Sequence, residues 1–280
     1  GVLSRILQEQ GIDVVAMTSM RACDVRAVLR LRKTLSRFHP SIVHVHDYSS
    51  LPYAVLANVL GPRCPLVFTS HGLLYEGFEP LQRRYRLFSR GITALAAVSE
   101  PVRDRHVAYL GWRRETHIVP NGVPLIARDP ADRAAVRREL QVADNAFVFL
   151  SVGNARPEKG FEDLVAAVSA TRGQHPELPF EVWIAGGLTD SDYCNRLRAA
   201  VDTPEMAGVR LLGFRNDASR LYSAADAIVI PSRSEGLPLV LLEGMTAGLP
   251  IIATRVGGIP DALPEGCGLL VEPGQPPSLA

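Results

Sequence analysis

The sequence predicts an α/β protein built from two domains, each with a doubly wound parallel sheet. Short apolar runs rich in β-branched residues alternate with helical stretches along the whole chain. The same rhythm occurs once before and once after the turn-rich segment V-P-N-G-V-P at 119–124. The chain has 280 residues and is 47% hydrophobic, which is ample for sheets that are buried on both faces.

The first half begins with an amphipathic helical stretch over residues 1–11. Five strand candidates follow it, at 13–18, 42–46, 66–70, 93–99 and 117–120. We expect a first domain over 1–122, with a hinge in the turn-rich segment.

The second half gives five more strand candidates, at 147–152, 181–186, 209–213, 227–231 and 251–256. Helical patterns lie between them, among them 161–170 and 193–201. We expect a second domain over 123–280.

Glu235 and Glu243 stand eight positions apart in the run P-S-R-S-E-G-L-P-L-V-L-L-E-G-M-T-A-G-L-P at 231–250. The pattern predicts a strand end, a turn and then a helix from about Leu237, because Pro238 needs no amide partner in a first helical turn. The N-terminal amides of that helix suit an anion such as a diphosphate. Two turns separate the carboxylates, so they can contact neighbouring parts of one elongated ligand.

A second constellation is V-G-N-A-R-P-E-K-G-F at 152–161, between a predicted strand and a predicted helix. Its Lys159 is one of only two lysines in a chain with 28 arginines. A lysine point charge and the fork of Arg156 can hold a diphosphate from two sides and stabilise a departing nucleotide. The alternative is a structural role, in which both cations cap the loop or pair with Glu158 and Glu162.

Histidines end two of the predicted strands. His71 follows the strand at 66–70, at the end where ligands bind in parallel α/β sheets, and His46 is its rival at the end of the strand at 42–46. His44 and His46 share a strand face, but a third metal ligand is not evident, so polar packing is the favoured interpretation.

D-S-D at 190–192 has the Asp-x-Asp form of a metal and nucleotide-sugar site. It directly precedes a helical pattern, however, so Asp190 or Ser191 is more simply a helix cap.

The E-x7-E run, the loop R-P-E-K-G at 156–160 and P-N-G-V together resemble a large family of retaining glycosyltransferases, family 4 (glycosyl transferases group 1), which have the GT-B fold. The resemblance implies two Rossmann-like domains facing across a cleft. It also implies transfer of a sugar from a nucleoside diphosphate donor to an acceptor hydroxyl, without a metal; the nucleotide-sugar is a substrate, and no cofactor is implied.

The resemblance assigns site residues. It implies that Arg156 and Lys159 stabilise the leaving diphosphate, that Glu235 contacts the sugar with the amides of Gly236 and Leu237, and that Glu243 binds the ribose. His71 is implied to line the face where the acceptor enters. The catalytic residues are then His71, Arg156, Lys159 and Glu235, and the donor-binding residues are Gly153, Arg156, Lys159, Glu235, Gly236, Leu237 and Glu243.

The chain departs from the family pattern at three places. Gly244 stands where the family usually has alanine, which lowers helix propensity but removes no functional group. The family normally begins one strand earlier, with a glycine-rich loop, and continues through further C-terminal helices. We therefore expect this chain to be an internal piece of the architecture.

Charge and cysteine usage bear on partners and location. A net charge of +1 argues against a nucleic-acid partner, and the four scattered cysteines, without a signal peptide or an apolar run near 18 residues, favour the cytoplasm. The run Q-R-R-Y-R-L-F-S-R at 82–90 places arginines beside Tyr85, Leu87 and Phe88, where a helix could contact anionic lipid at the inner face of a membrane. A solvated helix face explains the same run.

The predicted acceptor is a glycan or a lipid-linked molecule, in polysaccharide or glycolipid synthesis. Two other functions stay open on the sequence: a nucleotide-sugar epimerase of the same architecture, and a non-catalytic nucleotide-sugar-binding protein. Product analysis with donor alone distinguishes the epimerase, and the upstream coding sequence distinguishes the binding protein.

Overall fold

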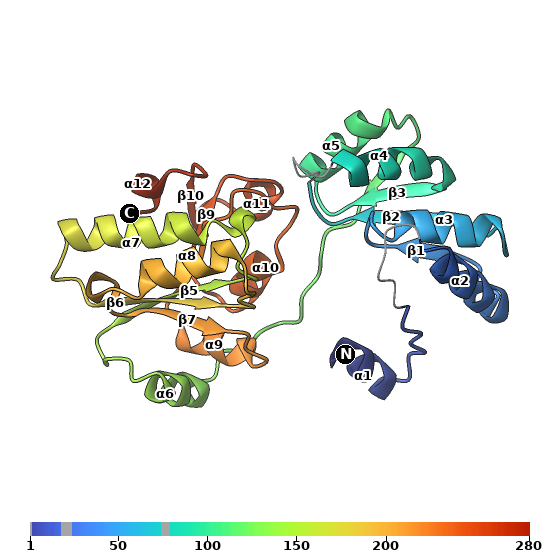
Figure 1. The fold of residues 1–280 in the computed structure, drawn as a ribbon. Coiled ribbons are helices and arrows are strands. Elements are labelled where there is room, and N and C mark those ends of the chain that lie inside the picture. The colour runs from blue at the N-terminus through green and yellow to red at the C-terminus, as the bar shows by residue number, and fades with distance from the viewer. Residues whose placement is uncertain (1, 18–23, 74–78) are drawn as a thin grey trace. The chain divides into compact units, whose positions relative to one another are not determined.

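The computed structural model describes residues 2–17, 24–73 and 79–280, and it divides into two compact units (Figure 1). The first unit comprises residues 1–97 and 103–118, and the second comprises 98–102 and 119–280. The main division thus falls between Ile118 and Val119, four residues before the boundary expected from the sequence.

The first unit contains a four-stranded parallel sheet of order β1-β2-β3-β4. Its strands are β1 (Val43–Val45), β2 (Leu66–Ser70), β3 (Ala94–Ala97) and β4 (Thr116–Ile118). Its helices are α1 (Val2–Glu9), α2 (Val25–Phe38), α3 (Leu51–Val59), α4 (Glu79–Phe88) and α5 (Glu100–Leu110), the first turn of which lies in the second unit.

One predicted strand of this unit is wrong. Residues 13–17, the described part of the candidate at 13–18, are not in a strand. A strand requires a neighbour to complete its backbone hydrogen bonds, and β1, at the edge of the sheet, pairs with β2 alone. Ile12 and Val15 are half exposed, so the apolar run finds no core to cover it.

The second unit contains a six-stranded parallel sheet of order β10-β9-β8-β5-β6-β7. Its strands are β5 (Phe147–Val152), β6 (Phe180–Ala185), β7 (Val209–Gly213), β8 (Ala227–Ile230), β9 (Ile251–Thr254) and β10 (Gly268–Val271). Its helices are α6 (Pro130–Glu139), α7 (Phe161–Gln174), α8 (Asp192–Val201), α9 (Ala218–Ala224), α10 (Leu239–Thr246), α11 (Ile259–Ala262) and α12 (Pro276–Leu279). β10 adds a strand that the sequence pattern did not reveal.

Two helices of the second unit begin at a capping side chain, Asp129 for α6 and Ser191 for α8. The hydroxyl of Ser191 accepts from the amide of Cys194 and starts α8, as the sequence predicted for D-S-D. α10 begins at Leu239, two residues later than expected, because Pro238 has extended backbone (ψ 134°) and stands before the helix.

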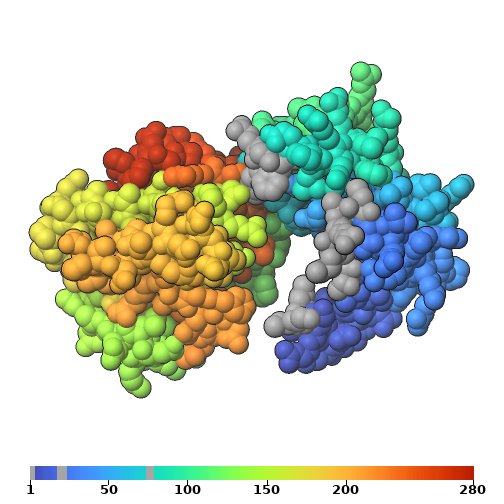
Figure 2. Space-filling model, in the orientation of Figure 1, coloured from blue at the N-terminus to red at the C-terminus, as the bar shows by residue number. Residues whose placement is uncertain are grey.

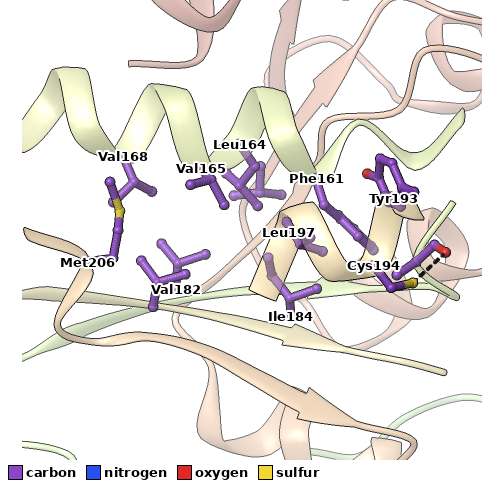
Figure 3. Close-up of a cluster of buried hydrophobic side chains, with 13 residues drawn as sticks. Phe161, Leu164, Val165, Val168, Val182, Ile184, Tyr193, Cys194, Leu197 and Met206 are labelled. Carbon is purple, nitrogen blue, oxygen red and sulfur yellow. Dashed lines mark hydrogen bonds between the residues drawn. The ribbon is translucent and has the colours of Figure 1, made fainter. Parts of the chain in front are cut away.

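The core of the second unit lies between the sheet and the helices α7 and α8, which lie side by side at the surface in Figure 2. Phe161 and Leu164 of α7 lie toward Leu197 of α8 above Ile184 of β6, and Val168 of α7 lies toward Met206 and Val182 (Figure 3). In Figure 1, α7, α8 and α12 cover one face of this sheet, while α6 and α9 lie on the other. Both faces are therefore covered, as parallel strands require.

The core of the first unit corrects one expectation about the arginine-rich segment at 82–90. Tyr85 was expected on the basic surface of this helix, but its side chain is fully buried among Phe68, Ile92 and Leu95. An apolar ring gains more from burial than from a place beside solvated arginines.

Candidate functional site

The order of the second sheet fixes where a ligand can bind. Read from β7, the order β7-β6-β5-β8-β9-β10 is that of a Rossmann sheet. The chain adds β6 and β7 on one side of β5 and then β8, β9 and β10 on the other side, so the strand order reverses between β5 and β8. Ligands of open parallel sheets bind at the carboxyl ends of the strands on either side of such a reversal. The segments that leave these two ends are 153–160 and 231–238, the segments that the sequence singled out. We call this region the switch-point crevice.

Two glycines allow the segments of the crevice to approach closely. Gly160 has φ +64°, and a Cβ there would lie 2.0 Å from the carbonyl oxygen of Pro231. Gly257, which follows β9, has φ +53°, and a Cβ there would lie 2.1 Å from the carbonyl oxygen of Glu235. Any other residue at either position would push the segment around Glu235 away.

Lys159 and Glu235 form an ion pair inside the crevice. The ammonium Nζ lies 2.6 Å from Glu235 Oε1, and the hydroxyl of Ser232 donates to the same oxygen at 2.7 Å. Glu235 is 8% exposed. The structure therefore joins two residues that the sequence had placed on different parts of the ligand, and it adds Ser232, which the sequence did not indicate.

The segment that carries Glu235 is tied to α7. The guanidinium of Arg233 donates to both carboxylate oxygens of the buried Asp163, at 2.6 and 2.7 Å. The amide of Arg233 donates to the carbonyl of Glu158 at 2.8 Å. A bidentate, charge-assisted contact of this kind fixes geometry as well as distance.

Arg156 differs from Lys159. It is exposed, just before the 3-10 turn Pro157–Lys159, and its side chain makes no hydrogen bond or ion pair to the residues that the structure describes. Neither cation pairs with Glu158 or Glu162 within the described chain: Lys159 pairs with Glu235, and Glu162 pairs with Arg196. Arg156 thus presents a guanidinium that a ligand can bind without breaking an internal contact.

The backbone before α10 offers hydrogen-bond donors. The carbonyl of Gly236 accepts from the amide of Gly258 at 2.6 Å, and the carbonyl of Leu237 accepts from the side chain of Asn121 at 2.8 Å. The amides of Gly236 and Leu237 donate to no residue in the described part of the chain, although both residues are buried. Two amides of buried residues that lack an acceptor in the described chain, beside a helix N-terminus, suit a negatively charged ligand.

Glu243 lies in α10 and is held by a buried tyrosine. The hydroxyl of Tyr222 donates to Glu243 Oε2 at 2.5 Å. Burial, and then the hydrogen bond to Glu243, raise the pKa of Tyr222, so the phenol stays protonated and remains a donor. This contact orients a carboxylate that is only partly buried and can accept from a ligand hydroxyl.

His71 lies in the first unit, directly after β2, in a histidine cluster. Its Nε2 is 2.9 Å from His46 Nδ1, and His44 bonds the hydroxyl of Thr69 at 2.8 Å. Burial, and then the neighbouring His46 and His71, lower the pKa of His44. His46 and His71 line a cavity of about 200 Å³. His71 and its rival His46 are thus direct neighbours.

The described residues provide neither a metal-ligand cluster nor a membrane-spanning helix. The three histidines do not form a metal-ligand set, and no other group of at least three His, Cys, Asp or Glu residues within 2–17, 24–73 and 79–280 does. None of the helices in those ranges is long and apolar enough to cross a bilayer.

The residues that the sequence missed act through tertiary contacts. Ser232 contacts Glu235 across a turn, and Tyr222 contacts Glu243 from α9. Asp163 of α7 binds Arg233, in the segment that carries Glu235. Asn121 had a signal, because it belongs to P-N-G-V, but that motif indicated a hinge and not a contact to Leu237.

Two family models match the chain. "Glycosyl transferases group 1" matches residues 146–280, and "Glycosyltransferase Family 4" matches residues 8–126. The matches coincide with most of the second and the first unit respectively.

Curated relatives agree with the models. The chain is 31% identical to a D-inositol 3-phosphate glycosyltransferase of Actinosynnema mirum, over 93% of this chain and 67% of that protein. It is also 31% identical to the enzyme of that name from Geodermatophilus obscurus, over 97% of this chain and 64% of the relative. The chain thus spans about two thirds of the length of these proteins.

Solved structures agree on the fold. HepE of Anabaena, crystallised with UDP-glucose, superimposes with a TM-score of 0.89 at 24% identity, over 100% of this chain and 78% of HepE. A sucrose-phosphate synthase of Thermosynechococcus elongatus superimposes with a TM-score of 0.76 at 22% identity, over 94% of this chain and 69% of that one. At these identities the likeness concerns the fold, two parallel-sheet α/β domains of the GT-B type.

Proposed function

The chain belongs to the glycosyltransferases of family 4 and group 1, and we propose that it is a retaining enzyme that moves a sugar from a nucleoside diphosphate to an acceptor hydroxyl. The observation that carries the proposal is the switch-point crevice of the second unit. There an exposed arginine, a lysine paired with a buried glutamate and the amides of two buried residues, which have no acceptor among the described residues, converge. A diphosphate with a sugar attached needs this combination of donors and acceptors.

Each residue has a proposed role. Arg156 and Lys159 bind the diphosphate and stabilise the charge that develops on it, and Glu243 accepts from the ribose. Glu235, with the amides of Gly236 and Leu237, binds the transferred sugar, and Gly153 lies beside the donor. These cations supply the stabilisation of negative charge for which other enzymes use a metal, so we expect neither a metal nor another cofactor to be required.

The proposed chemistry balances without a dedicated base. The bond between the sugar carbon and the leaving phosphate breaks, and the acceptor oxygen forms a bond to the same carbon from the same face, which retains the configuration. The acceptor proton passes to the leaving phosphate oxygen. His71 lines the entry of the acceptor in this scheme and orients its hydroxyl.

The proposed acceptor is a glycan or a lipid-linked molecule, and the proposed location is the cytoplasm with peripheral contact to the inner face of a membrane. The supporting surface is α4 and the turn after it, where Arg83, Arg86 and Arg90 are exposed beside Leu87, which is 60% exposed. Cations with an apolar neighbour bind anionic headgroups.

The membrane contact is tested by sedimentation with vesicles. The protein should sediment with phosphatidylglycerol vesicles and not with phosphatidylcholine vesicles, and changing the three arginines to glutamine should abolish this. Equal sedimentation of that variant would remove α4 from the proposal.

The activity is tested by product analysis. The protein is incubated with UDP-glucose, the compound bound to HepE, and with D-inositol 3-phosphate, the compound in the names of the curated relatives. GDP-mannose and lipid-linked oligosaccharides extend the panel. We expect nucleotide release that needs an acceptor, a product with the donor's anomeric configuration, and a loss of at least about 100-fold in Glu235→Gln. An inverted product, or a donor converted without any acceptor, would refute the proposal.

A further inference from the structure

A buried histidine of α5 holds the residues on both sides of His71. His106 is 1% exposed, and its Nε2 lies 2.7 Å from the hydroxyl of Ser70 and 2.9 Å from the carbonyl oxygen of Gly72. Ser70 precedes His71 and Gly72 follows it, so one nitrogen contacts both ends of the turn that carries the exposed His71 ring.

The chemistry of these partners fixes the proton of His106. A carbonyl oxygen can only accept, so Nε2 must carry the hydrogen. Burial lowers the pKa of His106 to about 4, so the ring is neutral at pH 7 and has only that one N–H. Nδ1 is therefore an acceptor, and the hydroxyl of Tyr85, at 2.8 Å, must donate to it.

The same logic orients Ser70. Its oxygen accepts from the shared N–H of His106, and its own hydroxyl hydrogen points to the carbonyl of Gly72 at 3.2 Å. The network Tyr85, His106, Ser70 and Gly72 joins α4, α5 and the end of β2. Each of its polar atoms has a partner, which makes a buried network rigid.

We propose that His106 is a positioning residue for His71: it clamps the turn 70–72 so that the His71 ring is held against His46 and toward the acceptor. The inference rests on the role proposed above for His71. The 2.9 Å contact between His71 Nε2 and His46 Nδ1 tolerates little displacement, since a hydrogen bond weakens steeply with distance and angle. If the clamp is lost, the ring that meets the substrate loses its orientation.

The alternative is that His106 is a satisfied core histidine that contributes to stability alone. Three variants separate the two roles. His106→Leu removes the donor and keeps an apolar side chain. His106→Gln keeps an N–H donor near the position of Nε2. Tyr85→Phe removes the hydroxyl that donates to Nδ1. Because it keeps the aromatic ring in the core, this variant also serves if His106→Leu does not fold.

The first readout does not depend on activity. The ring nitrogens of histidine report tautomer and hydrogen bonding in ¹⁵N NMR spectra, and His71→Asn assigns the His71 signals. We expect the His71 signals of His106→Leu to move toward those of a free imidazole, those of Tyr85→Phe to move the same way by less, and those of His106→Gln to stay near wild type. If the His71 signals stay unchanged in whichever of His106→Leu and Tyr85→Phe fold, the proposal is overturned.

The second readout is transfer from UDP-glucose. In His106→Leu we expect kcat to fall about 10- to 100-fold with the donor KM nearly unchanged, and His106→Gln to restore most of it. Ile92→Val, a conservative core change in the same unit, should keep wild-type kcat. Equal losses in Ile92→Val and His106→Leu would assign His106 to stability alone. If wild type transfers nothing, the function proposed above fails, and the NMR signals still decide the role of His106.

Discussion

Lys159 and Glu235 form an ion pair in the switch-point crevice, and this pairing affects stability. The Glu235 side chain is 10% exposed and that of Lys159 27%, so removing one partner leaves a poorly solvated charge. We expect Glu235→Gln and Lys159→Met each to lower the free energy of unfolding by about 1–3 kcal/mol.

A double-mutant cycle measures this coupling. The double variant Lys159→Met, Glu235→Gln should lose less than the sum of the single variants, because neither charge is left alone, while donor binding stays lost. Urea unfolding provides the free energies. Additive losses would contradict the 2.6 Å contact between the two side chains.

His106 makes stability depend on pH. Its pKa is about 4 in the folded protein against 6.5 for the ordinary value, so between these values the unfolded chain binds a proton that the folded chain does not. Stability is therefore complete above about pH 6.5 and falls as the pH drops toward 4, by about 1.4 kcal/mol per pH unit.

The prediction is checked by urea unfolding of wild type and His106→Gln at pH 7 and pH 5. From pH 7 to pH 5 wild type should lose about 2 kcal/mol more than the variant, which has no titrating ring at this position. Other groups titrate equally in both proteins and cancel. A pH dependence that is the same in both would show that His106 is not buried in the neutral form.

At the scale of elements, two arginines of α6 share one carboxylate of the second unit. Asp226 receives the guanidinium groups of Arg133 and Arg137 of α6, and it also accepts from the amide of Val148 in β5 at 2.8 Å. We expect Asp226→Ala to lower the free energy of unfolding by about 2–4 kcal/mol, because two partly buried arginines lose their counterion.

The matched control lies on the same helix. Glu139 is 45% exposed and pairs with Arg215, so Glu139→Gln should change the free energy of unfolding by less than about 0.5 kcal/mol. Chemical unfolding followed by far-UV circular dichroism checks both variants. An effect of Asp226→Ala as small as that of the control would mean that the contacts of Asp226 do not stabilise the packing of α6.

Local patterns predicted most strands but not their partners. β5 and β7 were predicted residue for residue, since each is an apolar run bounded by turn residues. The candidate at 13–18 was as apolar, yet its described part forms no strand, because a strand depends on a neighbour that its own residues do not encode. β10 was missed because Gly268 and its short run resemble a loop.

The site shows the same limit. Glu235 and Lys159 were predicted from their motifs, but not their direct pairing, since the two residues lie 76 positions apart and meet only because β5 and β8 are neighbours. Tyr85 was predicted on a basic surface and is a buried donor to His106. Helical periodicity alone did not show which face of α4 packs against the core of the first unit.

At the scale of the whole molecule, the two units divide the proposed work. The donor residues Gly153, Arg156, Lys159, Glu235 and Glu243 lie in the second unit, and His71 lies in the first. We therefore expect UDP to slow amide hydrogen exchange most in 153–160, 231–238 and α10, because bound ligand suppresses local opening. Protection centred on β2 and the turn after it would place the nucleotide in the wrong unit.

The most direct measurement is calorimetric binding of UDP, GDP and ADP to wild type, Arg156→Ala and Glu243→Ala, with Arg138→Ala on α6 as the control for loss of an exposed arginine. Circular dichroism and thermal melting first establish that all four proteins are folded. If the switch-point crevice binds the donor, wild type and Arg138→Ala bind one nucleotide selectively, and Arg156→Ala and Glu243→Ala bind it at least about tenfold more weakly. Equal affinity in all four folded proteins would contradict a donor site in the crevice.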